Sequence, residues 1–405
     1  MLPTPTTPLS RGEFVVLIAF MVSIVAMATD IMLPALGVIG QDLGVPDPND
    51  AQMIVTALFL GFGVGLLFAG PLSDSYGRKP VIYVGYGIFL VGCILSTLTD
   101  NWEVMILGRA LQGIGATFPR VVTIAIIRDG FAGRQMASIM SFIMAVFILV
   151  PMVAPAIGQG IILLSGWRAT FVFLMAMAIA AAIWFAYRQP ETLATGSRRP
   201  FSPSALREGT KEVCSSRIAV GYILATGLIN GAFIGYLSSA QQIFVEAYGA
   251  GTLFPLYFAI AALALGVASI LNARLVLRLG MRILTWWATL GLTALSVAFI
   301  LPAVLADGLP PLWAFIAWLV AVFFCVGFLF GNFNALAMEP LGKIAGLGAG
   351  IVGAVSTLVA LPLAFAIGNA YAGGVLHLIY GFAVLGIATV VVVLWTERGI
   401  PRSSE

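Results

Sequence analysis

Twelve apolar segments, each long enough to cross a lipid bilayer as a helix, dominate this chain. A hydrocarbon core about 30 Å thick needs about 20 mostly apolar residues per helical crossing. Of all residues, 60% are hydrophobic and 9% are charged, whereas a typical soluble domain has about 25% charged residues. The segments, separated by polar or Gly/Pro breaks, cover residues 14–36, 51–72, 80–99, 103–127, 136–164, 168–187, 217–245, 254–272, 283–305, 311–335, 345–371 and 375–395. We therefore expect an all-α integral membrane protein with twelve transmembrane helices.

The Lys and Arg residues fall almost entirely on one side of these helices. With the N-terminus in the cytoplasm, all of the 20 Lys and Arg residues except Arg109, Arg120 and Arg168 lie in cytoplasmic breaks or at cytoplasmic helix ends. Cytoplasmic loops of membrane proteins collect basic residues in this way. The opposite loops carry mainly acids, namely Asp42, Asp47, Asp50, Asp100, Glu103, Glu246 and Asp307. We therefore expect both termini in the cytoplasm.

The longest polar break divides the chain into two halves. It runs from Arg188 to Arg217 and is rich in basic residues, Pro, Ser, Thr and Gly. Such a segment could bind anionic lipid, but a solvated connector that obeys the charge rule explains it more simply. We expect an N-terminal six-helix bundle at 1–187, a cytoplasmic linker at 188–216 and a C-terminal six-helix bundle at 217–405.

The loops after the second helix of each half carry a weak internal repeat. Aligning Gly77 with Gly280 also superposes Lys79 on Arg282. Repeated halves that rock about a central site are typical of secondary transporters. The two halves are therefore expected to be pseudo-symmetric.

The first of these loops resembles that of the major facilitator superfamily. That family carries a Gly, an Asp four residues later, and then a Gly followed by basic residues between helices 2 and 3. The matching residues here are Gly70, Asp74, Gly77, Arg78 and Lys79, with Ser75 where the family usually has a basic residue. The acid and the bases can pair across the cytoplasmic face and favour one conformation of the rocking halves, so we expect a gating loop.

The fourth segment holds two intramembrane arginines. Arg109, with Gln112 and the glycines after it, is similar to a second signature of the same superfamily. An Arg inside a membrane costs about 2.5–3.5 kcal/mol on insertion scales, so it normally faces a cavity or a partner; Arg109 could also snorkel to the nearer surface. Arg120, near the middle of the segment, is expected to line the cavity, paired with Asp30 or with a substrate anion.

Asp30 is the only acid well inside any of the twelve segments. A carboxyl group in a low dielectric can hold a proton and release it when it becomes solvated or when a cation approaches. The alternative is a helix-end acid close to the periplasmic surface. We expect Asp30 to carry the proton, with Arg109 and Arg120 modulating it.

The fifth segment is similar to the antiporter signature of the superfamily in a loosened form. Pro155 and Gly158 match it, and Pro151 lies one turn earlier. Prolines bend a helix, and small residues allow close helix packing beside a cavity. The narrower resemblance, through Asp30 with Pro34 and through Trp167 with its neighbours, is to the Bcr/CflA drug-resistance subfamily.

The resemblance implies proton-coupled export of small organic compounds across the bacterial inner membrane. An importer or a metabolite exporter with the same fold stays open. An intramembrane enzyme has no support, since the membrane serines lack a paired base. Gln112, Tyr236 and Gln241 are candidates for the substrate cavity, while the lone His377 is expected to be structural. Besides substrate, protons and lipid, we expect no cofactor, no metal, no nucleic acid and a monomeric protein.

The charge distribution predicts the membrane topology. Alkaline phosphatase, which is active only outside the cytoplasm, should be active when fused near Asp47 and inactive when fused within 188–216. Green fluorescent protein fused at the same positions should give the opposite pattern. Phosphatase activity from the 188–216 fusion would show that the orientation is reversed.

Overall fold

The computed structural model describes residues 9–194, 196, 198 and 202–398, and the regular structure of this part is helical. Twelve of the described helices are long and apolar enough to cross a membrane, which confirms the predicted number and the all-α class. The chain forms two compact units: unit 1 is Met1–Pro46 with Ala57–Ser204, and unit 2 is Asp47–Thr56 with Ala205–Glu405. Parts of the predicted bundles and linker, at 1–8, 195, 197, 199–201 and 399–405, lie outside the described residues.

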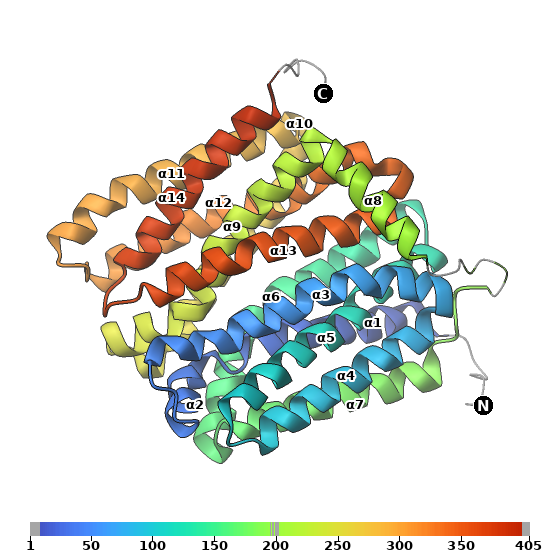
Figure 1. The fold of residues 1–405 in the computed structure, drawn as a ribbon, viewed down its shortest axis with the longest axis horizontal. Helices are drawn as coiled ribbons and strands as arrows, with labels where there is room; N and C mark the ends of the chain where they lie inside the picture. The colour runs from blue at the N-terminus through green and yellow to red at the C-terminus, as the bar shows by residue number, and fades with distance from the viewer. Residues whose placement is uncertain (1–8, 195, 197, 199–201, 399–405) are drawn as a thin grey trace. The chain divides into compact units, whose positions relative to one another are not determined.

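Unit 1 is built around its first helix. Its elements are α1 (Arg11–Asp30), η1 (Leu33–Ala35), α2 (Leu36–Asp42), most of α3 (Met53–Tyr76), α4 (Arg78–Leu98), α5 (Trp102–Gly130), α6 (Gly133–Ser165) and α7 (Arg168–Arg188) (Figure 1). Helix α1 packs against α5, α6 and α7, while α4 packs along α5 and α7. The helix that carries Asp30 is therefore at the centre of its unit.

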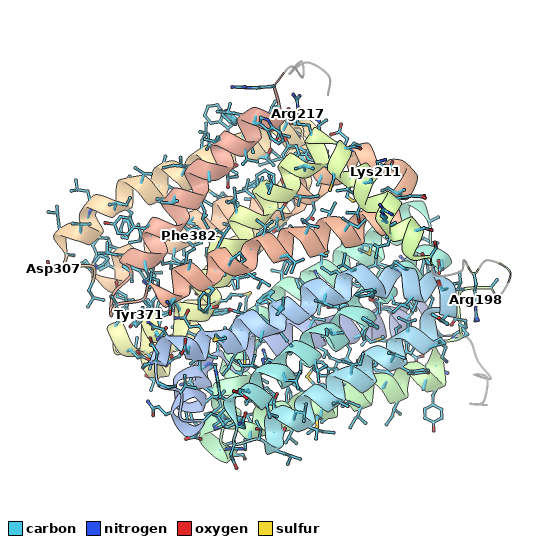
Figure 2. All side chains as sticks on the ribbon, in the orientation of Figure 1. Arg198, Lys211, Arg217, Asp307, Tyr371 and Phe382 are labelled. Atoms are coloured by element: carbon cyan, nitrogen blue, oxygen red, sulfur yellow. The ribbon has the colours of Figure 1, made fainter. Side chains whose placement is uncertain are left out.

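Unit 2 repeats this packing order. Its elements are η2 (Pro48–Gln52), α8 (Pro203–Ser215), α9 (Arg217–Gln241), η4 (Gln242–Ala247), η5 (Gly251–Leu253), α10 (Phe254–Leu279), α11 (Met281–Leu305), α12 (Leu312–Met338), η6 (Glu339–Ile344), α13 (Ala345–Asn369) and α14 (Leu376–Thr396). Helix α9 packs against α12, α13 and α14, and α11 packs along α12 and α14. Figure 2 places Arg217 at one end of this unit and Asp307 at the other.

Glycines in a left-handed conformation separate the second and third spanning helices of each unit. Gly77, with φ 104°, lies between α3 and α4, and Gly280, with φ 78°, lies between α10 and α11. A residue with a Cβ rarely adopts such angles, whereas glycine does so without penalty. The two residues aligned from sequence therefore make the same sharp turn.

The first spanning segment is broken where the sequence predicted a continuous helix over 14–36. Helix α1 ends at Asp30, and after a two-residue turn the chain continues as η1 and α2 to Asp42. Pro34 lies in the first turn of η1. Because proline lacks a backbone N–H, it is tolerated at the start of a helix but kinks or breaks one from within. Asp30 is thus the last residue of α1 rather than a residue inside a longer helix.

Part of the segment predicted as a linker is a docked helix. Helix α8 buries Gly209 and Val213. A side chain at Gly209 would meet Leu347 and Ile351 of α13, so the two helices approach closely there. Lys211 on the same helix is labelled in Figure 2.

Uncharged amides attach the segment Asp47–Thr56 to the rest of unit 2. Gln52 donates from Nε2 to Oε1 of Gln242, at 2.6 Å, and to the carbonyl of Gly368, at 3.0 Å. Gln242 in turn donates to Oδ1 of Asn49 at 3.0 Å, and the Tyr371 hydroxyl donates to the Gln242 carbonyl at 3.1 Å. Burial, with a smaller effect of a nearby acid, raises the pKa of Tyr371 to about 12, so its hydroxyl remains a donor at neutral pH. The start of α3 is therefore fixed within unit 2, while its remainder belongs to unit 1.

Candidate functional site

Asp30 is a buried acid without a partner. Its side chain is 4% exposed, and it forms no hydrogen bond or ion pair with any described residue. A buried carboxylate normally acquires a cation or several donors, because an unpaired charge in an apolar environment is costly. Asp30 is therefore a position where an unpaired negative charge would be costly.

The turn after Asp30 packs directly on the helix that carries the predicted antiporter motif. A Cβ at Gly158 of α6 would collide with the carbonyl oxygen of Ile31. Only glycine allows this approach, so Gly158 fixes the distance between α6 and the turn. Pro151 and Pro155 lie within α6, in the two turns before Gly158, and the helix continues through both.

Arg109 is enclosed by protein and does not snorkel. Its guanidinium is 0% exposed and donates to Oε1 of Gln112 at 2.5 Å and to the carbonyl of Ala28 at 3.0 Å. Gln112 donates to Oγ of Ser96 in α4 at 3.0 Å. The Arg109 guanidinium also lies over the ring of Phe171 in α7, 5.8 Å from its centroid. Arg109 thus ties α5 to α1, two residues before Asp30, and also to α4 and α7.

Arg120 has different surroundings. It lies far from both ends of α5, and its guanidinium is placed over two rings, 5.0 Å from the centroid of Phe62 in α3 and 5.2 Å from that of Phe147 in α6. The side chain is partly exposed. No ion pair joins it to Asp30 among the described residues. The suggested pairing of Asp30 with Arg120 is therefore wrong for this conformation, because Arg120 packs between α3 and α6 instead.

The three residues suggested for the substrate cavity are all covered by protein. Gln112 is engaged by Arg109 and Ser96, so it does not present a free polar group. Tyr236 stacks on Phe258 in unit 2. Gln241, also buried, ends α9. Gln112 therefore takes part in the hydrogen bonds around Arg109 and does not lie on an open surface.

The predicted gating loop forms an ion cluster within unit 1. Arg78, which is 4% exposed, binds Asp74 at 2.5 Å and Asp129 at the end of α5 at 3.0 Å. The Glu191 carboxylate accepts from the backbone N–H groups of Arg78 and Lys79, each at 3.0 Å, and so caps the start of α4. We call Asp74, Arg78, Asp129 and Glu191 the Arg78 cluster. It holds together the adjoining ends of α3, α4, α5 and the segment after α7.

The remaining loop residues have local roles. Lys79 donates from Nζ to the carbonyls of Ala186, at 3.2 Å, and Gln189, at 2.7 Å, at the C-terminal end of α7. Ser75, which replaces the usual basic residue, donates to the carbonyl of Pro71 at 2.9 Å. Gly70 lies inside α3 with open space around its Cα.

Comparison with known proteins identifies the family. The profile of the Major Facilitator Superfamily matches residues 18–362. This chain belongs to the Major Facilitator Superfamily. The resemblance noted from the loop and helix motifs is thereby confirmed.

The relatives include proteins named for drug resistance. Bicyclomycin resistance protein homolog of Haemophilus influenzae is 27% identical over 352 residues, which cover 84% of this chain and 85% of that protein. Multidrug resistance protein D of Escherichia coli is 26% identical over 356 residues, covering 85% of this chain and 86% of the relative. The crystal structure of a D-xylose-proton symporter has a TM-score of 0.73 at 15% identity, over 96% of this chain and 97% of the symporter. That last similarity supports the fold alone.

Unit 2 of this superfamily member contains a counterpart of the Arg78 cluster. Arg282, near the start of α11, binds Glu339 after α12 at 2.6 Å and Glu397 after α14 at 3.3 Å. The Tyr222 hydroxyl also donates to Glu397, at 2.5 Å. In unit 2 both acids follow the fourth and sixth spanning helices, whereas in unit 1 Arg78 binds Asp129 in the last turn of the fourth spanning helix, and Glu191 after the sixth accepts from the Arg78 backbone N–H.

Sequence reasoning assigned no role to these acids. Asp129, Glu191, Glu339 and Glu397 each lie at or just beyond a helix end, on the side where Lys and Arg predominate. Most charged residues on that side are Lys and Arg, so an acid there is unusual. This exception to the charge pattern is the sequence signal that could have identified the four acids. Within the described residues, no group of three or more His, Cys, Asp or Glu side chains is arranged to hold a metal ion.

The Arg78 cluster predicts a graded series of stability losses. Arg78→Gln should lower the free energy of unfolding by about 3 kcal/mol, since it leaves two acids without their common partner. Asp74→Asn should cost less than about 1 kcal/mol, because Asp74 is half exposed, and Asp129→Asn should be intermediate. Unfolding midpoints of the purified variants in detergent would measure this order.

Arg168→Gln is the matched control. Arg168 forms an exposed pair with Asp100, so its loss should leave the midpoint nearly unchanged. An Asp74→Asn variant as unstable as Arg78→Gln would contradict the expected order of stability losses.

Proposed function

We propose that this chain is a secondary active exporter that exchanges small organic compounds for protons by alternating access. The observation that carries the proposal is the buried, unpartnered carboxyl group of Asp30 at the break in the first spanning segment. A carboxyl group can take up a proton in one environment and release it in a more polar one. Among the acids of the described spanning segments, Asp30 alone is both buried and without a partner.

The surroundings of Asp30 support the proposal that its solvation changes when the neighbouring helices move. Arg109 binds the carbonyl of Ala28 on one side of Asp30, and Gly158 packs on the carbonyl of Ile31 on the other. A shift of α5 or α6 relative to α1 would thus be transmitted to the peptide groups that flank the acid. Such a shift would change its solvation and hence its tendency to hold a proton.

Drug-resistance relatives favour export over import. The names of the Haemophilus influenzae and Escherichia coli relatives refer to resistance to bicyclomycin and to multiple drugs. A compound that is toxic in the cytoplasm is removed by export, so the same direction is proposed here. We also propose that the protein is a monomer of the bacterial inner membrane with cytoplasmic termini. It would use the proton gradient in place of a bound cofactor.

Proton coupling through Asp30 predicts a separation of two activities. Asp30→Asn keeps size and polarity but cannot exchange a proton, so export driven by a pH gradient should fall to background. Counterflow exchange of substrate needs no net proton movement and should be largely retained. Both are measured in proteoliposomes, with a compound to which expression of the protein confers resistance in an efflux-deficient host.

Two further variants act as controls for the Asp30 experiment. Asp30→Glu keeps a titratable group and should retain part of the driven export. Asp307→Asn removes an exposed acid at a position with φ 51°, a conformation that Asn adopts readily, and should export at the wild-type rate. Undiminished driven export by Asp30→Asn would place proton coupling elsewhere. Equal loss of both activities would instead make Asp30 a structural or substrate-binding residue.

The Arg78 cluster is proposed to gate the cycle. Asp74→Asn leaves Arg78 bound to Asp129, so the fold should persist while the balance between conformations changes. We expect slower export with unchanged substrate affinity. A purified Asp74→Asn variant that transports at the wild-type rate would show that Asp74 has no gating role.

A further inference from the structure

The two arginines deep in unit 1 differ in how their charge is balanced. Arg109 is covered by protein and donates to an amide and to a carbonyl. The guanidinium of Arg120 lies over the faces of Phe62 and Phe147, and it forms no hydrogen bond or ion pair through its side chain with any described residue. A guanidinium carries five N–H donors. Arg120 therefore offers a full set of donors without a protein acceptor.

Aromatic rings do not satisfy the hydrogen-bonding capacity of this arginine. An arginine in the middle of a membrane costs about 2.5–3.5 kcal/mol on insertion scales. A cation–π contact with each ring stabilises it by about 0.5–2 kcal/mol. The rings supply no oxygen acceptor for the five donors. Because the side chain is partly exposed, the missing acceptors can come from a molecule that reaches it from outside the protein.

Lipid headgroups are too distant to supply these acceptors. Arg120 lies ten residues before the end of α5 at Gly130, which is about 15 Å at a rise of 1.5 Å per residue. The other end of the helix, at Trp102, is farther away. The acceptors must therefore come from water or from a solute that reaches the level of the middle of the helix.

We propose that Arg120, Phe62 and Phe147 form a binding site for the anionic group of an organic substrate, a carboxylate or another oxyanion attached to an apolar body. The guanidinium pairs with two oxygens of such a group through parallel hydrogen bonds. The rings beside it, from α3 and α6, pack against the adjoining apolar part. This inference rests on the proposed export function only in calling the bound molecule a substrate.

The same geometry disfavours cationic and neutral ligands. A cation would be repelled by Arg120, and the faces of Phe62 and Phe147 that could attract it are already occupied by the guanidinium. A neutral amide offers one oxygen with no net charge, and such hydrogen bonds are about half as strong as charge-assisted ones. Selectivity for anions over matched neutral compounds is thus the direct consequence of an unpaired arginine.

Equilibrium binding to the purified protein in detergent tests the site without requiring transport. The probes are radiolabelled naphthoate, naphthamide and naphthylmethylammonium, which share one apolar body and differ in charge. Wild type should bind naphthoate at least about tenfold more tightly than naphthamide, a difference of the size expected for a charge-assisted pair, and should bind the ammonium compound least. Arg120→Gln should abolish the preference for naphthoate.

Matched variants separate a binding role from a structural one. Arg120→Lys keeps the charge but loses the planar fork, so it should retain a preference for naphthoate that is weaker than that of wild type. Arg168→Gln removes an exposed cation far from the site in the chain and should bind as wild type does. Each variant is first shown to be folded by size-exclusion chromatography, and Arg120→Lys provides the test if Arg120→Gln does not fold.

The possible results either support or overturn the proposal. Absence of naphthoate binding by wild type, equal binding of naphthoate and naphthamide, or a preference unchanged by both Arg120 variants would each overturn it. If the preference depends on Arg120 but no compound is exported under a pH gradient, the anion site stands and the export function fails. If Asp30-dependent export is found while anion preference is absent, the export function stands and the anion site fails.

Discussion

The high cost of a charge in an apolar environment determines most features of this protein. It confines nearly all Lys and Arg residues to helix ends. It also makes each ionisable group within a spanning helix informative, since such a group must be neutral, paired or supplied with a partner from outside. Unit 1 holds three such groups in different surroundings: Asp30 is buried without a partner among the described residues, Arg109 is bound by polar groups, and Arg120 lies between rings.

The same constraint acts where helices meet at their ends. Arg78 and Arg282 each follow a left-handed glycine, and each gathers acids from the ends of two other helices of its unit. A partly buried arginine with two acids keeps one partner when the other is lost. The repetition of this arrangement, together with the matching packing of α1 and α9, shows that the two units follow one plan despite little sequence similarity at the loops.

Local sequence signals predicted the features that depend on one segment at a time. Hydropathy identified the twelve spanning helices, and the Gly77 and Gly280 alignment identified equivalent turns. Contacts between residues that are far apart in the sequence could not be predicted in this way. Asp129 and Glu191 contact Arg78 from 51 and 113 residues away in the chain. The break after Asp30 was also missed, although Pro34 was visible, because the apolar run continues through it.

The separation of Asp30 from Arg120 has a consequence for coupling. In a direct ion pair, protonation of the acid would release the arginine, and proton and substrate would compete for one site. In the proposed mechanism the proton and the substrate occupy different sites, so their exchange would depend on a structural change that both sites sense. Helix α5 offers a continuous connection, since it carries Arg120 and also Arg109, whose guanidinium binds the Ala28 carbonyl beside Asp30. A ligand bound by Arg120 beside Phe62 and Phe147 would thus act on the helix that positions the peptide groups next to the acid.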